Sequence, residues 1–158
     1  MGNDTGPIRR QLSPRRLAIG ALILLVAIQF FPVWLWETNP APKSQPKWAS
    51  AETQALTQRA CYDCHSNQTT WPWYASVAPA SWLIARDVIA GRKALNFDDW
   101  QTTLARADRF PLDQQVRREI SRGDMPPSYF LWLHPDAKLT TTEQQQLIDG
   151  LAKTIQAK

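Results

Sequence analysis

Residues 61–65 read Cys61-Tyr62-Asp63-Cys64-His65, which is a C-x-x-C-H motif. Two thiols at this spacing can add to the two vinyl groups of a haem, and the histidine that follows is then held under the ring, where it can bind iron. Cys61 and Cys64 are the only cysteines, so no thiol is left over for a structural disulfide. The motif predicts one covalently attached haem c, with His65 as an axial ligand of the iron.

Three other uses of the motif are open. A thioredoxin-like redox pair belongs beside a βαβ pattern, and the sequence has none. A zinc site needs four ligands, which Cys61, Cys64, His65 and His134 would supply only in an irregular arrangement. A disulfide between the two cysteines would close a very short loop and stabilise little.

The second axial position has few candidates. After Trp48 the chain holds one methionine, Met125, and one histidine besides His65, which is His134. Met125 follows a helix-ending glycine and precedes two prolines, whose fixed φ angles lower the entropy lost in holding a sulfur on iron. We expect Met125 to be the second iron ligand. The alternatives are a packing role for Met125, ligation by His134, or an open iron position.

The N-terminal part predicts a membrane anchor. Residues 1–16 are basic, and residues 17–36 (LAIGALILLVAIQFFPVWLW) carry no charge. A helix of that length spans about 30 Å, the thickness of a bilayer hydrocarbon core. The arginines place residues 1–16 in the cytoplasm and the later residues in the periplasm, which makes the chain a single-pass protein of the inner membrane. A signal peptide cleaved at residues 49–51 is the alternative.

Residues 37–48 are rich in proline and predict an extended, semi-rigid linker that holds the next domain off the membrane. From Trp48 onward, twelve Lys and Arg face twelve Asp and Glu, so the net charge of +4 lies in the N-terminal part. The basic charge therefore orients the anchor, and we expect no nucleic-acid partner.

Residues 49–158 predict an all-α domain of short helices and long loops, since no stretch alternates as a strand does. The expected helices begin after Ser50 and run into Cys61, extend from Pro79 to Gly91, open near residues 98–100, run from Leu112 to Gly123, and follow a Thr140/Glu143 capping box. Their inward faces are expected to hold Trp82, Ala85, Val88, Ile89, Leu112, Val116, Ile120, Leu147, Ile148, Leu151 and Ile155. A helical domain this small is marginal alone, and a haem would complete its core.

Several other side chains are weaker candidates. Trp71 and Trp73 either line a haem edge or are ordinary core aromatics. Arg86, Arg92 and Lys93 either pair with haem propionates or are plain surface charge.

The chain after Trp48 resembles the small single-haem "haem-binding domain" family of exported bacterial proteins, which are relatives of cytochrome c. The matching stretches are CYDCHSNQTTWPWY (Cys61–Tyr74), APASWLIARDVIAGRKALNF (Ala78–Phe97) and GDMPPSYFLWLHPDAKLT (Gly123–Thr140). The resemblance implies a cytochrome c-like fold, haem attachment by Cys61 and Cys64, and axial ligation by His65 and Met125. The membrane segment and the linker lie outside it.

These features together predict a membrane-anchored, periplasmic monohaem c-type cytochrome that passes single electrons between exported redox partner proteins and is not an enzyme. His/Met ligation fills both axial positions of the iron, which suits electron transfer better than catalysis. Two other functions are open: a haem-based sensor, and a peroxidase-like haem enzyme with an exchangeable sixth ligand.

Overall fold

The computed structural model describes residues 13–107 and 111–157. Within these ranges there are seven α-helices, three short 3-10 turns and no sheet, which confirms the predicted all-α class. The helices are α1 (Pro14–Ile28), α2 (Ala51–His65), α3 (Ala80–Ala94), α4 (Trp100–Ala107), α5 (Leu112–Ser121), α6 (Ser128–Leu131) and α7 (Thr141–Gln156), and the turns are η1 (Val33–Leu35), η2 (Trp73–Ser76) and η3 (Pro135–Ala137).

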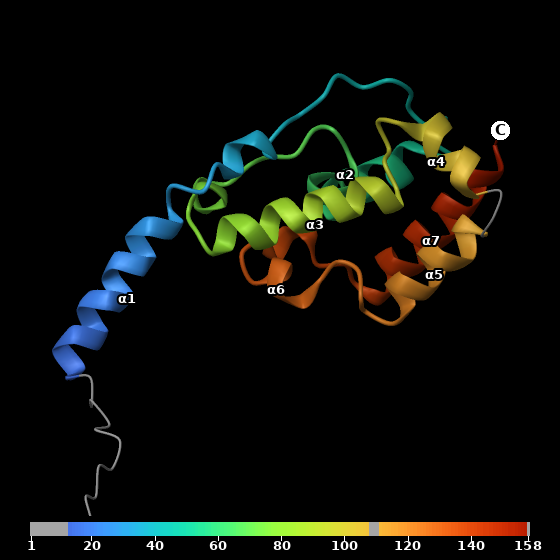
Figure 1. Cartoon of the computed structure of the whole chain (residues 1–158). Helices are drawn as coiled ribbons and strands as arrows, with labels where there is room; N and C mark the ends of the chain where they lie inside the picture. The colour runs from blue at the N-terminus through green and yellow to red at the C-terminus, as the bar shows by residue number, and fades with distance from the viewer. Residues whose placement is uncertain (1–12, 108–110, 158) are drawn as a thin grey trace, which may run out of the picture.

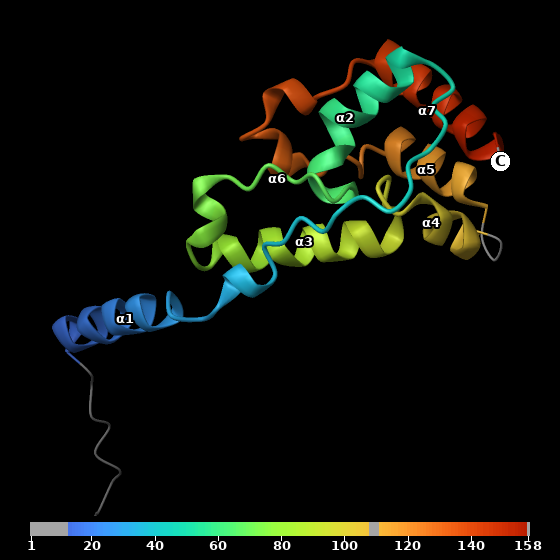
Figure 2. The same ribbon diagram turned by 90° about the horizontal axis from the view of Figure 1, so that it is seen from above.

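Helix α2 lies at the centre of the domain, where it packs against α3 on one side and α7 on the other. Helix α5 packs along α7, and the short α6 lies beneath the first half of α3 (Figure 1). Helix α1 projects away from this body, as Figure 2 shows from above. The arrangement places α3, α5, α7 and the loop before α6 around the end of α2, which carries the C-x-x-C-H motif.

Both predicted N-caps are confirmed. The Ser50 side chain accepts a hydrogen bond of 3.1 Å from the Thr53 N–H, and α2 runs past Cys61 to His65. At α7, Thr140 and Glu143 form a reciprocal capping box with bonds of 3.2 and 2.8 Å. The side chains predicted to face inward from α5 and α7 do so: Leu112, Ile120, Leu147, Ile148 and Leu151 are buried, and Val116 and Ile155 pack against them.

Helix α3 differs from its prediction. It was expected to end at Gly91 but continues to Ala94. Gly91 lies inside the helix because α3 crosses α2 there in backbone contact, and a Cβ at this position would collide with the carbonyl oxygen of Cys64. The predicted apolar face is also partly wrong, since Ala85 and Val88 are buried whereas Trp82 and Ile89 are 37% and 48% exposed.

The predicted single helix over residues 17–36 is wrong in its extent. Helix α1 ends at Ile28, and the chain turns before η1. Pro32 explains the break, because it lacks an N–H and disfavours helical geometry at the residue before it. In the part of the chain that is described, we find no helix of sufficient length and hydrophobicity to cross a bilayer. Most of the predicted cytoplasmic tail, residues 1–12, lies outside the described residues.

The proline-rich segment 37–48, predicted as a semi-rigid linker, contains no helix and is hydrogen-bonded to the domain. The backbone N–H of Lys43 donates to the Asp98 carbonyl at 2.8 Å, and the Trp100 N–H donates to the Ser44 carbonyl at 3.1 Å. The Trp48 ring lies 5.4 Å from the ring of Phe97, which is completely buried. The segment therefore forms part of the domain surface.

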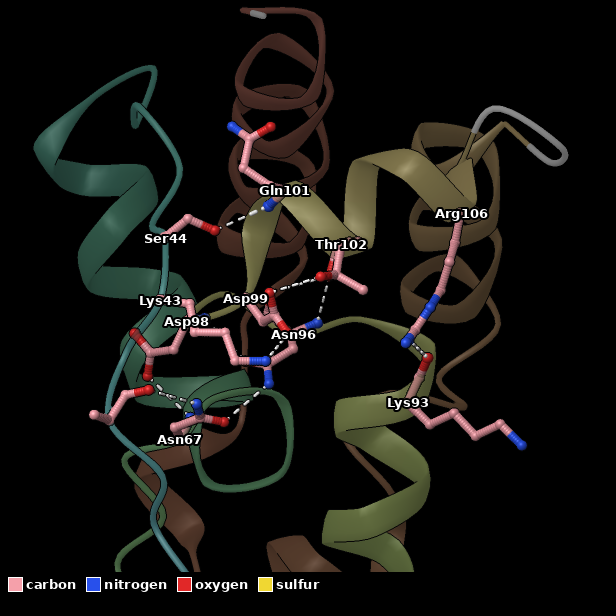
Figure 3. A network of polar contacts seen from close by, with 12 residues as sticks. Lys43, Ser44, Asn67, Lys93, Asn96, Asp98, Asp99, Gln101, Thr102 and Arg106 are labelled. Carbon is pink, nitrogen blue, oxygen red and sulfur yellow. Dashed lines mark hydrogen bonds and ion pairs between the residues drawn. The ribbon is translucent and has the colours of Figure 1, made fainter.

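A buried polar cluster fixes this segment to the loops around α2 and α3 (Figure 3). The carboxylate of Asp98 is fully buried and accepts hydrogen bonds from the Asn67 N–H at 2.9 Å and from the side chains of Gln45 and Gln68 at 2.8–3.1 Å. Asn96 donates to the Asn67 side chain at 2.9 Å. Both oxygens of this buried carboxylate accept hydrogen bonds. The cluster can therefore stabilise a single arrangement of segment 37–48, the loop after α2 and the loop after α3.

We expect Gly91→Ala to destabilise the domain by roughly 1–3 kcal/mol, because the new methyl group must push α2 and α3 apart. Chemical denaturation followed by circular dichroism measures the effect. The control is Gly20→Ala, the same substitution in α1, where nothing lies within 4 Å of the position that the new methyl group would take. Equal stability of the two variants would show that the α2–α3 contact is not tight.

Candidate functional site

A cavity of about 410 Å³ lies between the end of α2, the second half of α3, helices α5 and α7, and the loop that precedes α6. Cys61, Cys64, His65 and Met125 all line it. Its walls are mainly apolar and include Leu95, Phe97, Leu112, Val116, Ile120, Leu139, Leu147 and Leu151. His65 and Met125 are 60 positions apart in the sequence. The fold brings both to the same apolar cavity as Cys61 and Cys64.

His65 is oriented by a hydrogen bond between its Nδ1 and the Leu95 carbonyl oxygen, 3.0 Å apart. A carbonyl only accepts, so Nδ1 carries the proton and Nε2 keeps a free lone pair. Burial lowers the pKa of His65, although the bond to Leu95 opposes the effect. The ring is therefore held neutral, in the tautomer that binds a metal through Nε2.

The two cysteines are free thiols, half-buried in the cavity wall. Burial raises the pKa of Cys61 to about 12, and Cys64 adds to this shift. Burial also raises the pKa of Cys64 to about 11, with further contributions from Asp63 and Asp87. Both groups are thus protonated at neutral pH, unlike the reactive thiolate of a redox C-x-x-C pair.

The zinc alternative finds no support in the arrangement of ligands. Within residues 13–107 and 111–157, no three His, Cys, Asp or Glu side chains come together as a metal-binding group. His134 does not line the cavity that holds Cys61 and His65, but lines an adjoining one of about 220 Å³ that Cys64 also borders.

Met125 is positioned by the end of α5. Gly123 has a φ of +73°, its N–H donates to Ile120, and the Asp124 N–H donates to Glu119, each at 3.0 Å. This pair of bonds is a Schellman motif, which favours glycine at the left-handed position. The Met125 N–H also donates to the Glu119 carbonyl at 3.2 Å. The predicted helix end at Gly123 is confirmed, and it directs the chain so that Met125 reaches the cavity.

Tyr129 and Asp87 join α6 to α3 at the border of the two cavities. The Tyr129 hydroxyl donates to the Asp87 carboxylate at 2.6 Å, and both residues line both cavities. This hydrogen bond raises the pKa of Tyr129 to about 12, so the phenol remains protonated. The loop that carries Met125 is therefore held at both ends, by the Gly123 turn before it and by the Tyr129–Asp87 hydrogen bond after it.

The weaker candidates lie elsewhere. Neither Trp71 nor Trp73 lines the larger cavity, and Trp73 is 81% exposed. His134 stacks on Phe130 with ring centroids 3.9 Å apart, and its Nδ1 lies 3.0 Å from the Phe130 carbonyl.

The cations proposed for propionates have other contacts. Arg92 donates to the Ser66 and Thr38 carbonyls, each at 2.7 Å, and to the side chains of Asn39 and Thr69. Arg86 forms an ion pair of 3.0 Å with its neighbour Asp87. Arg92 therefore joins the segment before α2 to the loop after it, whereas Lys93 is exposed.

Sequence reasoning identified the polar donors of the cavity but not its walls. Leu112, Ile120, Leu147 and Leu151 were predicted only as inward-facing core residues, yet they also line the cavity. Helical periodicity gives the buried side of each helix, but not which buried side chains face a cavity rather than another helix.

These features fit a haem. Two protonated thiols, an imidazole with a free Nε2 and a thioether share a cavity of a size typical of cofactor sites, and most of its surface is apolar. An all-α domain with such a cavity defines the class of small haem-binding proteins. A family model described as "Haem-binding domain" matches residues 23–153, so the chain belongs to this family, which implies a haem cofactor.

The match is longer than the sequence resemblance suggested. It begins at residue 23, within α1, and therefore includes the proline-rich segment that was placed outside the family. No curated protein and no solved structure matches the chain significantly.

We expect Gly123→Ala to destabilise the protein by about 1–2 kcal/mol, because a side chain strains the left-handed conformation there. The substitution meets no atom within 4 Å, so the effect isolates backbone strain from a steric clash. Gly123→Asn serves as the matched variant and should lose less, since asparagine tolerates this conformation. Urea denaturation of the three proteins tests the order, and an alanine variant as stable as the native chain would contradict it.

Proposed function

We propose that the protein is a membrane-anchored, periplasmic monohaem c-type cytochrome, in which Cys61 and Cys64 attach the haem and His65 and Met125 are the axial ligands. It transfers single electrons between redox partners and catalyses no reaction of its own. The observation that carries the proposal is that all four donor residues line one apolar cavity.

Each residue has a separate role in this proposal. When bound, the haem supplies a one-electron redox centre. The thiols of Cys61 and Cys64 form the covalent links, and the Leu95 carbonyl holds His65 in the ligating tautomer. Met125 offers a neutral, soft sulfur that favours the reduced metal and raises the reduction potential. The apolar walls exclude water from the site, which also raises the reduction potential.

Membrane anchoring is supported by the surface of α1. Its apolar side chains are exposed on every side, including Leu22, Ile23 and Leu24 at 61–63%. A helix that is apolar all round needs a non-aqueous environment, and Arg15 and Arg16 at its start suit the cytoplasmic side of a bilayer. Residues 17–36 would then be the single-pass anchor in the inner membrane, and residues 49–158 the periplasmic haem domain.

A second function is favoured by one observation. Met125 is 40% exposed and lies on a loop, which would suit a ligand that detaches from the iron. In that case the protein would be a haem-based sensor or a peroxidase-like enzyme with an exchangeable sixth position. The loop is, however, held at both ends, by the Gly123 turn and by the Tyr129–Asp87 hydrogen bond. This favours Met125 as a ligand that stays on the iron.

We expect Met125→Ala to abolish the weak sulfur-to-iron charge-transfer band of the oxidised protein and to lower its reduction potential, because the sulfur ligand is lost. The ferrous variant should also bind carbon monoxide, whereas the native protein should not. Optical spectra and a redox titration of the matured protein measure these changes.

The control for this experiment is Ile89→Ala, which shortens an exposed apolar side chain that lines neither cavity. It should leave the band and the potential unchanged. A native protein that binds carbon monoxide readily would favour the sensor or enzyme. Identical spectra of Met125→Ala and the native protein would exclude Met125 as a ligand.

A further inference from the structure

We infer that one end of the haem domain rests in the outer interface of the membrane, in a fixed orientation set by Gln29. To this membrane-facing end we assign six exposed apolar side chains from η2, the start of α3 and the end of α6: Trp73, Val77, Trp82, Leu83, Trp132 and Leu133. The inference depends on the proposed membrane anchoring and names the lipid interface as the occupant of this surface.

Gln29 is the one polar side chain between Leu17 and Trp36, and it joins the anchor segment to the domain. Its Nε2 donates to the Ala78 carbonyl at 3.1 Å, and its Oε1 accepts from the Ala78 N–H at 3.0 Å. The amide thereby satisfies both polar groups of a residue that is only 5% exposed. The substitution Gln29→Leu would leave these groups unpaired.

Two apolar contacts extend this junction. The rings of Phe31 and Trp82 meet edge to face with centroids 6.1 Å apart, and Val33 is 5% exposed where η1 packs on α3. The chain that leaves α1 is therefore attached to the start of α3. A rigid junction of this kind fixes the angle between α1 and the domain (Figure 2).

The length of α1 sets the depth of the junction. Its 15 residues cover about 22 Å, whereas a bilayer hydrocarbon core is about 30 Å thick. Residues 29–36 must therefore complete the crossing, although they are not one continuous helix. Irregular backbone is tolerated at that depth only where protein covers it. Gln29 and Phe31 contact Ala78 and Trp82, and η1 packs on α3, so this part of the domain lies at the level of the outer interface.

The surface around this junction has the composition of an interfacial surface. Trp73 and Trp132 are 81% and 82% exposed, and Leu133 is 63% exposed. Amphipathic tryptophan rings favour the headgroup region of a bilayer, and clustered apolar groups of this size are unfavourable in water. Arg86 and Asp87, which follow Trp82 and Leu83 on α3, form an ion pair of 3.0 Å.

This orientation has a consequence for the cofactor site. Leu83 and Leu133 line the smaller cavity, and so does Cys64, which also borders the larger one. The Cys64 side of the haem site therefore faces the bilayer. An electron donor within the membrane would approach from this side, while a periplasmic acceptor would reach the opposite side of the domain.

Site-directed spin labelling of the full-length, haem-loaded protein in nanodiscs of phosphatidylethanolamine and phosphatidylglycerol tests the inference. Haem attachment consumes both native thiols, so Leu133→Cys and Gln146→Cys each provide a single labelling position. Gln146 is exposed on α7 and lines neither cavity, which makes it the aqueous control. Collision with oxygen, compared with collision with a water-soluble nickel chelate, reports whether each label is in lipid.

We expect the oxygen-to-nickel accessibility ratio at position 133 to be several-fold higher than at position 146. Adding Gln29→Leu should bring the two ratios together, because the junction loosens while the anchor segment, now more apolar, stays in the disc. If the protein remains in the disc but both labels are equally aqueous, the surface binds a protein partner or nothing, and the inference is overturned.

Two other outcomes separate the parts of the proposal. If the protein does not co-purify with the discs, membrane anchoring fails together with the inference, while haem binding is unaffected. If Gln29→Leu leaves the ratio at position 133 unchanged, Gln29 does not set the orientation.

Discussion

The backbone contact between α2 and α3 at Gly91 and Cys64 is the constraint on which the site depends. Because Gly91 has no side chain, α3 can cross directly over the last turn of α2, which carries Cys61, Cys64 and His65. The chain then leaves α3 beside the motif, so that the Leu95 carbonyl reaches His65 Nδ1 and the Phe97 N–H donates to the His65 carbonyl at 2.8 Å. One close helix crossing thus fixes both the position and the tautomer of the histidine.

The same domain has a core that a cofactor would complete. Tyr62, Phe97 and Trp100 stack in sequence, with centroid separations of 5.7 and 6.0 Å. Phe97 also lines the cavity, where side chains of α5 and α7 face an open space rather than packing fully on α2. A group that binds only the folded chain stabilises it by mass action, and a covalently attached group cannot dissociate. A haem attached through Cys61 and Cys64, as we propose, would therefore stabilise the folded domain.

Much of the site was predictable because its chemistry is local in sequence. The C-x-x-C-H motif, the glycine stop before Met125 and the two N-caps each depend on a few adjacent residues, and the structure places them as expected. The errors arose where distant segments meet. Gly91 lies inside a helix rather than ending it, because α3 contacts the backbone of Cys64 there. Segment 37–48 is part of the domain because its backbone is hydrogen-bonded to Asp98. Gln29, the one polar side chain of the apolar segment 17–36, binds the backbone of Ala78, which no local pattern indicates.

We propose that this cavity holds one haem bound covalently through Cys61 and Cys64. The most direct measurement is the intact mass, under denaturing conditions, of the protein made together with haem-maturation machinery. We predict the mass of the polypeptide plus one haem, and this increment should disappear when both cysteines are replaced by serine. A native chain that shows only the mass of the polypeptide, with its colour lost into acidified organic solvent, would contradict the account.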